Sequence, residues 1–398
     1  MILINTENSF TSIAEDELVL ASDSYVGEGQ QAIFNNVSSE TISISLLEDG
    51  KVYYFKVVPY SDETGSRVYT NDQSSVFVTT TSCTFTSGTD TTTDEFEARN
   101  DDDDYQAYSS TVTSEVCFSI DFDNNLLTIS SNQWPDHHMG STAVSGRFPT
   151  AYVVATETTR EIAYKPTYDE MNGLTYVFDE TGGPTPSNPN FYQFGIASNG
   201  VEYHPMGVEP WAILDSDGGE TGEENWEWQQ RVVFEGDVNL DSRGGHTTSR
   251  GNYHYHGDIV DLVEEDGSKH SKIYGYAADG FPIYYKYGFE DPDPSNLDTA
   301  VVELVSSYQL RSGNRSTHPN VDADEVEGED YPSGSFDGTY IQDYEYVDGL
   351  GDLDECNGRF GATPEFSDGT YYYVITDGFP RVPNCFVGDP DDDFIIGN

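Results

Sequence analysis

The chain has 398 residues, of which 17 are basic and 72 are acidic, so its formal net charge is −55. This charge excludes nucleic acid and anionic membrane surfaces as partners, because binding to either one requires a positive field. The sequence contains no run of about 18 apolar residues, so we expect no insertion into a membrane. The excess of carboxylates indicates a saline habitat, scattered calcium sites or a cationic partner.

The composition predicts a mainly β protein. Tyrosine (28 residues) and phenylalanine (21 residues) supply large side chains that can close a core, and Thr, Ser, Val and Gly are abundant. The length leaves room for two or three domains.

Residues 1–80 are expected to form a partial β-sandwich. The runs 41–46 and 50–60 alternate apolar and polar side chains, as half-buried strands do. The segment 53–65, which begins Tyr-Tyr-Phe-Lys-Val, resembles the late strands of a fibronectin type III domain, and residues 24–29 resemble an insert of its bacterial versions. The opening strands of that domain are missing. We therefore expect a piece of a longer secreted protein, the alternative being a shortened module that starts at Met1. A second copy could supply the missing strands, which predicts self-assembly.

Residues 81–116 are expected to form a linker. They are rich in Thr and Ser and then acidic, with four consecutive aspartates at 101–104. Such a run is usually solvated. Calcium is an alternative ligand there, although consecutive aspartates lack the spaced ligands and the turn glycine of a calcium loop.

Residues 117–398 are expected to form a larger β-rich domain with few short helices. Its first strands, 116–121 and 126–130, flank an Asn-Asn turn at 124–125. Further buried strands are predicted at 192–197 and 273–277, and short helices at 226–234 and 301–310.

The segment Tyr253-His254-Tyr255-His256 carries the strongest chemical signal in the chain. In a strand the side chains alternate, so His254 and His256 share one face while Tyr253 and Tyr255 share the other, where they can support the histidines from behind. Two imidazoles so placed form half of a metal site. The alternative is a pair of packed histidines between core tyrosines.

This segment belongs to a series of sequence blocks that resembles the YHYH family over roughly residues 118–388. The blocks follow one another in the order of the family: Gly251–Gly257, Gly275–Tyr284, Tyr340–Tyr346, Gly351–Arg359, Thr363–Glu365 and Phe379–Phe386. The resemblance implies a bacterial protein that is secreted or attached to the cell surface. It implies no particular activity.

A metal needs three or four ligands, so further donors are expected near the pair. His246, eight residues before His254, and His137, which lies in a further block of the family, are the candidates, and His204 is a weaker one. Imidazole ligands suit copper or zinc, and the tyrosines and an oxidising location favour copper.

Three further positions have competing interpretations. Asp279 is either an acceptor that orients a ligand imidazole or a turn residue that binds its own backbone. His270 and His318 are expected to be exposed. Arg359 is expected to pair with a carboxylate, either to hold the neighbouring loop or to bind an anionic ligand.

The chain has four cysteines, none of them in a Cys-x-x-Cys pair: Cys83, Cys117, Cys356 and Cys385. In a chain that resembles secreted proteins, this number suggests two disulfides. Among the three possible connectivities we expect neighbours to pair, Cys83 with Cys117 and Cys356 with Cys385. Four free buried thiols are the alternative.

No complete catalytic motif is present, so enzymatic activity is left open. The sequence contains neither a Gly-x-Ser-x-Gly elbow nor a His-Glu-x-x-His motif. Only secretion and aromatic content suggest an enzyme acting on polysaccharide. The first hypothesis is a secreted protein whose histidines bind copper or zinc. The alternative is an adhesin or an extracellular filament subunit in which the histidines are structural.

Overall fold

A computed structural model of the chain describes the following residues, to which every structural statement below refers: 2–5, 31–34, 52–57, 60–63, 66–69, 74–79, 88–90, 114–121, 124–137, 153–168, 173–177, 191–232, 240, 244–248, 251–257, 265–293, 295–296, 299–366 and 368–396.

The N-terminal strands form an antiparallel sheet in the order β2-β1-β3-β6 and a separate hairpin, β4–β5. Their bounds are β1 Ile2–Asn5, β2 Gln31–Phe34, β3 Val52–Val57, β4 Tyr60–Glu63, β5 Ser66–Tyr69 and β6 Ser74–Thr79. The strand predicted at 50–60 thus includes β3 and the start of β4. The predicted segments at 24–29, 41–46 and 101–104 lie outside the described residues.

The next strands confirm the predicted hairpin around the Asn-Asn turn. β8 (Val116–Asp121) and β9 (Leu126–Ser131) pair antiparallel, and β11 (Thr158–Ala163) extends them to a sheet of three. Asn125 has a φ of 53°, a left-handed conformation that asparagine tolerates better than most residues. β7 (Gly88–Asp90) pairs antiparallel with β10 (Val153–Ala155) in a separate two-stranded sheet.

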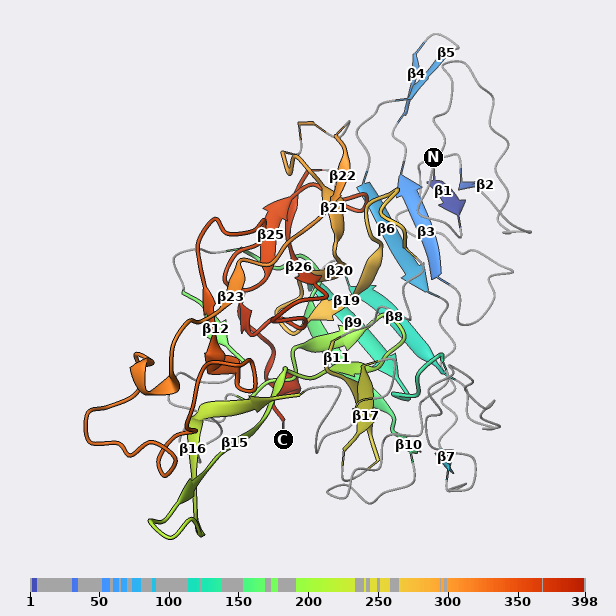
Figure 1. Cartoon of the computed structure of the whole chain (residues 1–398). Coiled ribbons are helices and arrows are strands. Elements are labelled where there is room, and N and C mark those ends of the chain that lie inside the picture. The colour runs from blue at the N-terminus through green and yellow to red at the C-terminus, as the bar shows by residue number, and fades with distance from the viewer. Residues whose placement is uncertain are drawn as a thin grey trace.

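An eight-stranded mixed sheet forms the centre of the molecule, in the order β17-β18-β14-β13-β19-β20-β26-β25 (Figure 1). Its strands are β13 Gly195–Ala197, β14 Glu202–Tyr203, β17 Gly245–Thr247, β18 Tyr253–Tyr255, β19 Ile273–Ala277, β20 Pro282–Tyr285, β25 Gly358–Gly361 and β26 Thr370–Ile375. β14 pairs in parallel with β18, and β20 with β26, whereas the other neighbours are antiparallel. β19 confirms the strand predicted at 273–277, and β13 confirms the last three residues of the strand predicted at 192–197.

Aromatic side chains make up much of the core against this sheet. Phe194 stacks on Phe386 with ring centres 5.2 Å apart, and meets the edge of the Tyr373 ring at 5.0 Å. Each of these rings is fully buried. Such pairs add to the free energy gained by burying their large apolar surfaces, so a chain with modest aliphatic content still closes a core.

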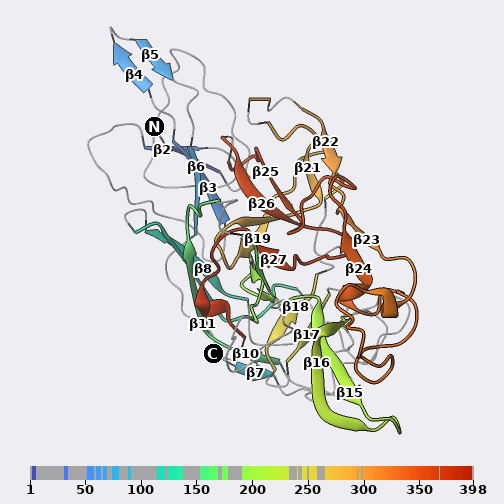
Figure 2. The same cartoon turned by 90° about the vertical axis from the view of Figure 1, so that its left-hand side faces the viewer.

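The two predicted helices are wrong. Residues 226–231 belong to β16 (Glu220–Arg231), which pairs antiparallel with β15 (Gly207–Leu214) in a hairpin that extends away from the rest of the molecule (Figures 1 and 2). The segment 301–310 contains β22 (Val301–Glu303) and β23 (Tyr308–Leu310). In both segments cross-strand pairing overrides the local helix propensity of Glu, Gln, Arg and Leu residues.

Short pairs and turns complete the described fold. β12 (Thr175–Tyr176) pairs with β27 (Cys385–Phe386), β21 (Tyr287–Phe289) with β22, and β23 with β24 (Tyr344–Tyr346). The helical segments are 3₁₀ turns, η2 (Arg315–Thr317), η3 (Ile341–Asp343) and η4 (Asp392–Phe394). Within the described residues, no helix has the length and apolarity needed to cross a membrane.

The predicted disulfide between Cys356 and Cys385 is confirmed, with a Cα–Cα distance of 5.0 Å. It ties the start of β25 to β27. Cys117 is also disulfide-bonded, while its predicted partner, Cys83, lies outside the described residues.

Candidate metal centre

Three neighbouring strands at one edge of the eight-stranded sheet bring four histidines together. His254 lies in β18 and His256 directly follows it, so the alternation of the strand places both on one face. β17 pairs antiparallel with β18 and sets His246 opposite His254. β14 pairs in parallel on the other side and sets Glu202 opposite His254, with His204 two residues further on the same face.

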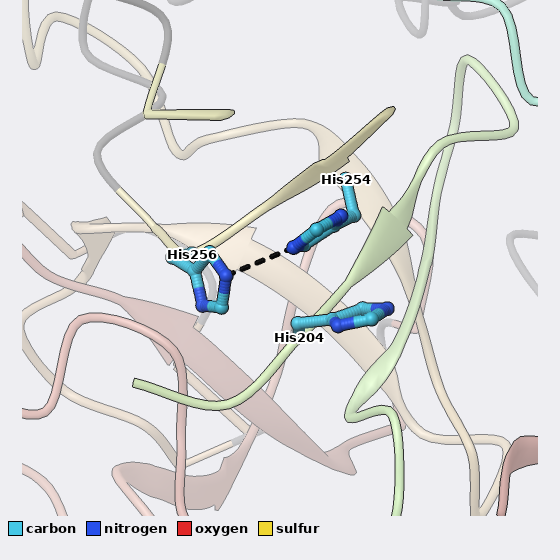
Figure 3. A group of neighbouring side chains, drawn as sticks. All are labelled: His204, His254 and His256. Carbon is cyan, nitrogen blue, oxygen red and sulfur yellow. Dashed lines mark hydrogen bonds between the residues drawn. The ribbon is translucent and has the colours of Figure 1, made fainter. Parts of the chain in front are cut away.

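The imidazoles approach one another closely. The Nε2 atom of His256 lies 3.0 Å from Nε2 of His254 and 3.0 Å from Nε2 of His246. His204, His254 and His256 each offer a nitrogen, and these three nitrogens lie within 4.8 Å of one another. Figure 3 shows these three rings. His254 and His256 come from the same segment of the chain, and the ring of His204 faces them from the neighbouring strand.

Backbone carbonyls fix the tautomers of two of these rings. His254 Nδ1 lies 3.2 Å from the carbonyl oxygen of Asn252, and His256 Nδ1 lies 2.7 Å from that of Pro205. A carbonyl oxygen only accepts, so each Nδ1 carries the proton and donates it. In the neutral rings both Nε2 atoms are therefore unprotonated, and their lone pairs face each other at 3.0 Å.

Burial keeps these rings neutral. His246, His254 and His256 are 5%, 4% and 2% exposed, so little water reaches them. Burial lowers the pKa of His254 and His256 well below the ordinary histidine value, and the neighbouring imidazoles lower it further. Burial and the nearby His204 lower the pKa of His246 to about 4. The neutral imidazole that results is the form that binds metals.

His204 lies beside two polar side chains, Glu202 and Gln193. Its Nε2 atom lies 3.9 Å from Oε2 of Glu202 and 3.4 Å from Nε2 of Gln193. Glu202 accepts from Arg160 Nη2 at 2.6 Å and from Gln193 at 2.5 Å. Burial raises the pKa of Glu202, but the hydrogen bond with His204 and the charge of Arg160 lower it further than burial raises it, so this carboxylate is ionised.

The structure places His137 with the tyrosines and not with the other histidines. Its Nε2 atom lies 2.6 Å from the hydroxyl of Tyr255, whose oxygen also accepts from Asn199 at 2.9 Å. Tyr253 and Tyr255 are buried, and their rings pack against His137 on the face of β18 opposite to the imidazoles. The structure therefore keeps the His137 ring away from the other imidazoles, whereas His204, the weaker candidate, lies beside them.

Asp279 is a turn residue here. It is buried in the β19–β20 turn, where it accepts from the backbone of Phe281 and Gly388 and from the Tyr373 hydroxyl at 2.6 Å. Burial raises its pKa to about 6 against these hydrogen bonds. Its hydrogen-bond partners within the described residues do not include an imidazole, so the turn interpretation fits the geometry.

Three other predictions about polar residues differ from the structure. His318 is buried and packs its ring against Trp228, and His270 packs among the rings of Tyr284, Phe289 and Tyr372, so neither is an exposed loop residue. Arg359 donates to the hydroxyl of Tyr372 at 2.6 Å and to the carbonyl of Phe289. Its role here is structural, but the partners are a tyrosine and the backbone and not a carboxylate.

The fold and the site define a mainly β protein with a buried histidine cluster at the edge of its central sheet. A family model described as YHYH protein matches residues 179–388, more than half of the chain, and the chain belongs to this family. The matched region contains all four clustered histidines, whereas His137 precedes it. No curated protein and no solved structure matches the chain.

Proposed function

We propose that this protein is an extracellular metal-binding protein whose histidine cluster holds a copper or zinc ion. The observation that carries the proposal is the pair of Nε2 lone pairs of His254 and His256, opposed at 3.0 Å. Two unprotonated nitrogens at this separation repel each other. A cation beside the line that joins them, within reach of both lone pairs, would turn this repulsion into two bonds.

The distances suit a transition metal. With metal–nitrogen bonds of about 2.0–2.1 Å, two ligands at angles of 90–110° lie about 2.9–3.4 Å apart. The Nε2 separations within the cluster, 3.0 Å for each of the two measured pairs, fall in this range. Neutral imidazoles without carboxylates favour copper or zinc over calcium or magnesium, which prefer oxygen ligands.

The surroundings of the ligands also resemble those of metal sites. A ligand histidine usually donates its second ring N–H to a carbonyl or carboxylate, which fixes the ring. His254 and His256 do so through Asn252 and Pro205. Because the clustered histidines come from neighbouring strands at the sheet edge, a bound ion would join these strands and stabilise the fold.

The extracellular location is supported by the cysteines. Cys117, Cys356 and Cys385 are disulfide-bonded, and disulfides persist in oxidising compartments and are rare in the cytosol.

Metal analysis of matched variants tests the proposal. The double variant His254→Gln, His256→Gln keeps side chains that can donate to the carbonyls of Asn252 and Pro205, but it removes both Nε2 ligands. Wild-type protein loaded with copper or zinc and then desalted should retain about one ion per chain, and the double variant should retain none, as measured by elemental analysis. His137→Gln is the matched control, because it removes a histidine that contacts the same strand from the opposite face, and it should retain the ion.

Circular dichroism and gel filtration must show that the double variant is folded. Equal metal content in the wild type and a folded double variant would refute the proposal.

A further inference from the structure

We propose that the metal is held by His246, His254 and His256, and that its fourth position remains open on the side of His204, where it binds a small exogenous anion. This inference rests on the proposed metal site. It adds a division of roles among the four histidines and a class of external ligand.

Ring geometry separates three histidines from the fourth. The centre of an imidazole lies about 3.1–3.2 Å from a metal bound to its nitrogen, so two rings at 90–110° on one ion have centres about 4.5–5.2 Å apart. The ring centres of His246, His254 and His256 are 4.5, 4.8 and 5.0 Å apart, with interplanar angles of 61–72°. The spacing of these three ring centres therefore fits three ligands of one ion.

The ring of His204 does not fit this spacing, either toward His254 or toward His256. Its ring stacks on that of His254, with centres 3.9 Å apart and an interplanar angle of 27°, and it lies 5.9 Å from the ring of His256. The first distance is too short and the second too long for three ligands of one ion at these angles. His204 thus lies beside the position that the other three rings define.

The same residue connects the cluster with solvent. His204 is partly exposed, whereas the other three histidines are buried. Its Nε2 atom lies 3.4 Å from Nε2 of Gln193 and 3.9 Å from Oε2 of Glu202, on the side of the ring where these two residues lie. A metal with three protein ligands and an accessible fourth position is the arrangement that admits water or another external ligand.

The local charge favours an anion at this position. The three ligands are neutral, and Glu202, the buried carboxylate that the described residues place beside the cluster, is already neutralised by Arg160 at 2.6 Å. A divalent ion would therefore bring an uncompensated double positive charge into a buried site. Such a charge is costly at low dielectric, and an anionic fourth ligand reduces it.

Two single variants test the division of roles. In protein loaded with copper(II), His246→Gln should lower the metal affinity by more than about 100-fold, since it removes a ligand, whereas His204→Gln should lower it by less than about tenfold. The measurement is a competition titration with a chelator of known affinity. Comparable losses in the two variants would overturn the inference.

Azide, a small anionic probe, tests the open position without relying on any variant. Adding it to the copper-loaded wild-type protein should produce a new ligand-to-metal absorption band that saturates at one azide per copper, and should change the electron paramagnetic resonance spectrum. In His204→Gln the band should persist with an altered azide affinity. If azide leaves both spectra of the wild type unchanged, the fourth position is closed and the inference fails.

The two proposals fail in different ways. If the folded double variant at positions 254 and 256 keeps its metal, the metal site itself is refuted. If that variant loses the metal but His204→Gln loses it as readily as His246→Gln does, only the division of roles is refuted.

Discussion

Two buried polar clusters in this molecule differ in how their polar atoms are paired. Arg315 and Asp343 are both buried, and the guanidinium binds the carboxylate through Nε at 2.9 Å and Nη2 at 2.8 Å. The other bonds of Arg315 go to Asp337 and to the carbonyl of Ser333. In the histidine cluster, by contrast, the lone pairs of His254 and His256 face each other.

The difference separates a structural cluster from a site for a ligand. Asp343 also accepts from the backbone of Gly338 at 2.9 Å, so the charges around Arg315 are compensated by protein groups alone. Such a cluster holds its loops together and has no place for a further ion. A cation from outside would bind the opposed lone pairs of His254 and His256. The following experiments compare the two clusters, from the largest expected effect to the smallest.

Breaking the Arg315 cluster should cost the most stability. Asp343→Ala leaves a buried guanidinium without its main partner and should lower the free energy of unfolding by about 3–5 kcal/mol, as measured by urea denaturation. Metal content should not change. Glu345→Ala is the matched control, because its ion pair with Arg311 is partly exposed and should contribute less than about 1 kcal/mol. Equal losses in the two variants would contradict the structural role of the buried pair.

The buried His318, which packs near the Arg315 cluster, should make stability depend on pH. Burial and the charge of Arg311 lower its pKa to about 4, against the opposing effect of Asp343. In the unfolded chain the pKa of His318 is near 6.5. Between pH 6.5 and 4, His318 therefore binds a proton in the unfolded chain but not in the folded chain. The stability should be full above pH 6.5 and decline by at most about 3 kcal/mol as the pH falls toward 4.

Comparison with His318→Gln isolates this contribution. Unfolding curves of both proteins between pH 4 and 8, recorded with a chelator, should differ by a free energy that shrinks as the pH falls. Parallel pH profiles would show that His318 does not titrate between the two states.

Occupying the histidine cluster should stabilise the fold. Copper or zinc at a free concentration 100 times its dissociation constant should raise the free energy of unfolding by about 2.7 kcal/mol, because the ion binds only the folded state. Thermal melts with and without a chelator measure the change, and the double variant at positions 254 and 256 should show none. An equal response of that variant would mean that the ion binds elsewhere.

The smallest expected effect concerns a buried hydroxyl next to the histidine cluster, compared with the hydroxyl of the following residue. Thr247 is fully buried, and its Oγ1 atom has no hydrogen-bond partner within the described part of the chain. Thr247→Val should therefore raise the free energy of unfolding by about 1 kcal/mol. The neighbouring Thr248 accepts a hydrogen bond from Asn252, so Thr248→Val should lower the free energy by about the same amount. Changes of the same sign in both variants would contradict this reading.

The sequence predicted the half of the site that depends on local alternation. His254 and His256 share a face because of the strand period, and His246 joins them through an antiparallel neighbour close in the chain, which a hairpin-like return suggests. Local alternation could not place His204 beside them, because β14 pairs in parallel with β18, and parallel pairs join segments far apart in the chain. The Glu202-x-His204 spacing was the available signal, since it places both side chains on one face.

The misassigned helices have a related cause. The segment at 226–231 is rich in residues with good helix propensity, yet Trp226 and Trp228 follow the two-residue period of a strand. The pairing of β16 with β15 decided the outcome, and that pairing depends on tertiary contacts that a local propensity does not contain. The position of His137 has a similar cause. It contacts Tyr255, which is distant in the chain, and the residues next to His137 in the sequence do not indicate which face of β18 it reaches.

The parallel pairing of β14 and β18 has a consequence for how the protein folds. Pro205 and His256, which are hydrogen-bonded across this junction, are 51 residues apart in the chain, and the β15–β16 hairpin lies within that crossover. Closing so long a loop costs entropy before any contact across it forms, which delays such pairings relative to local hairpins. Metal capture should therefore be among the last events of folding, and the rate at which a refolding chain takes up copper would report directly on the closure of this crossover.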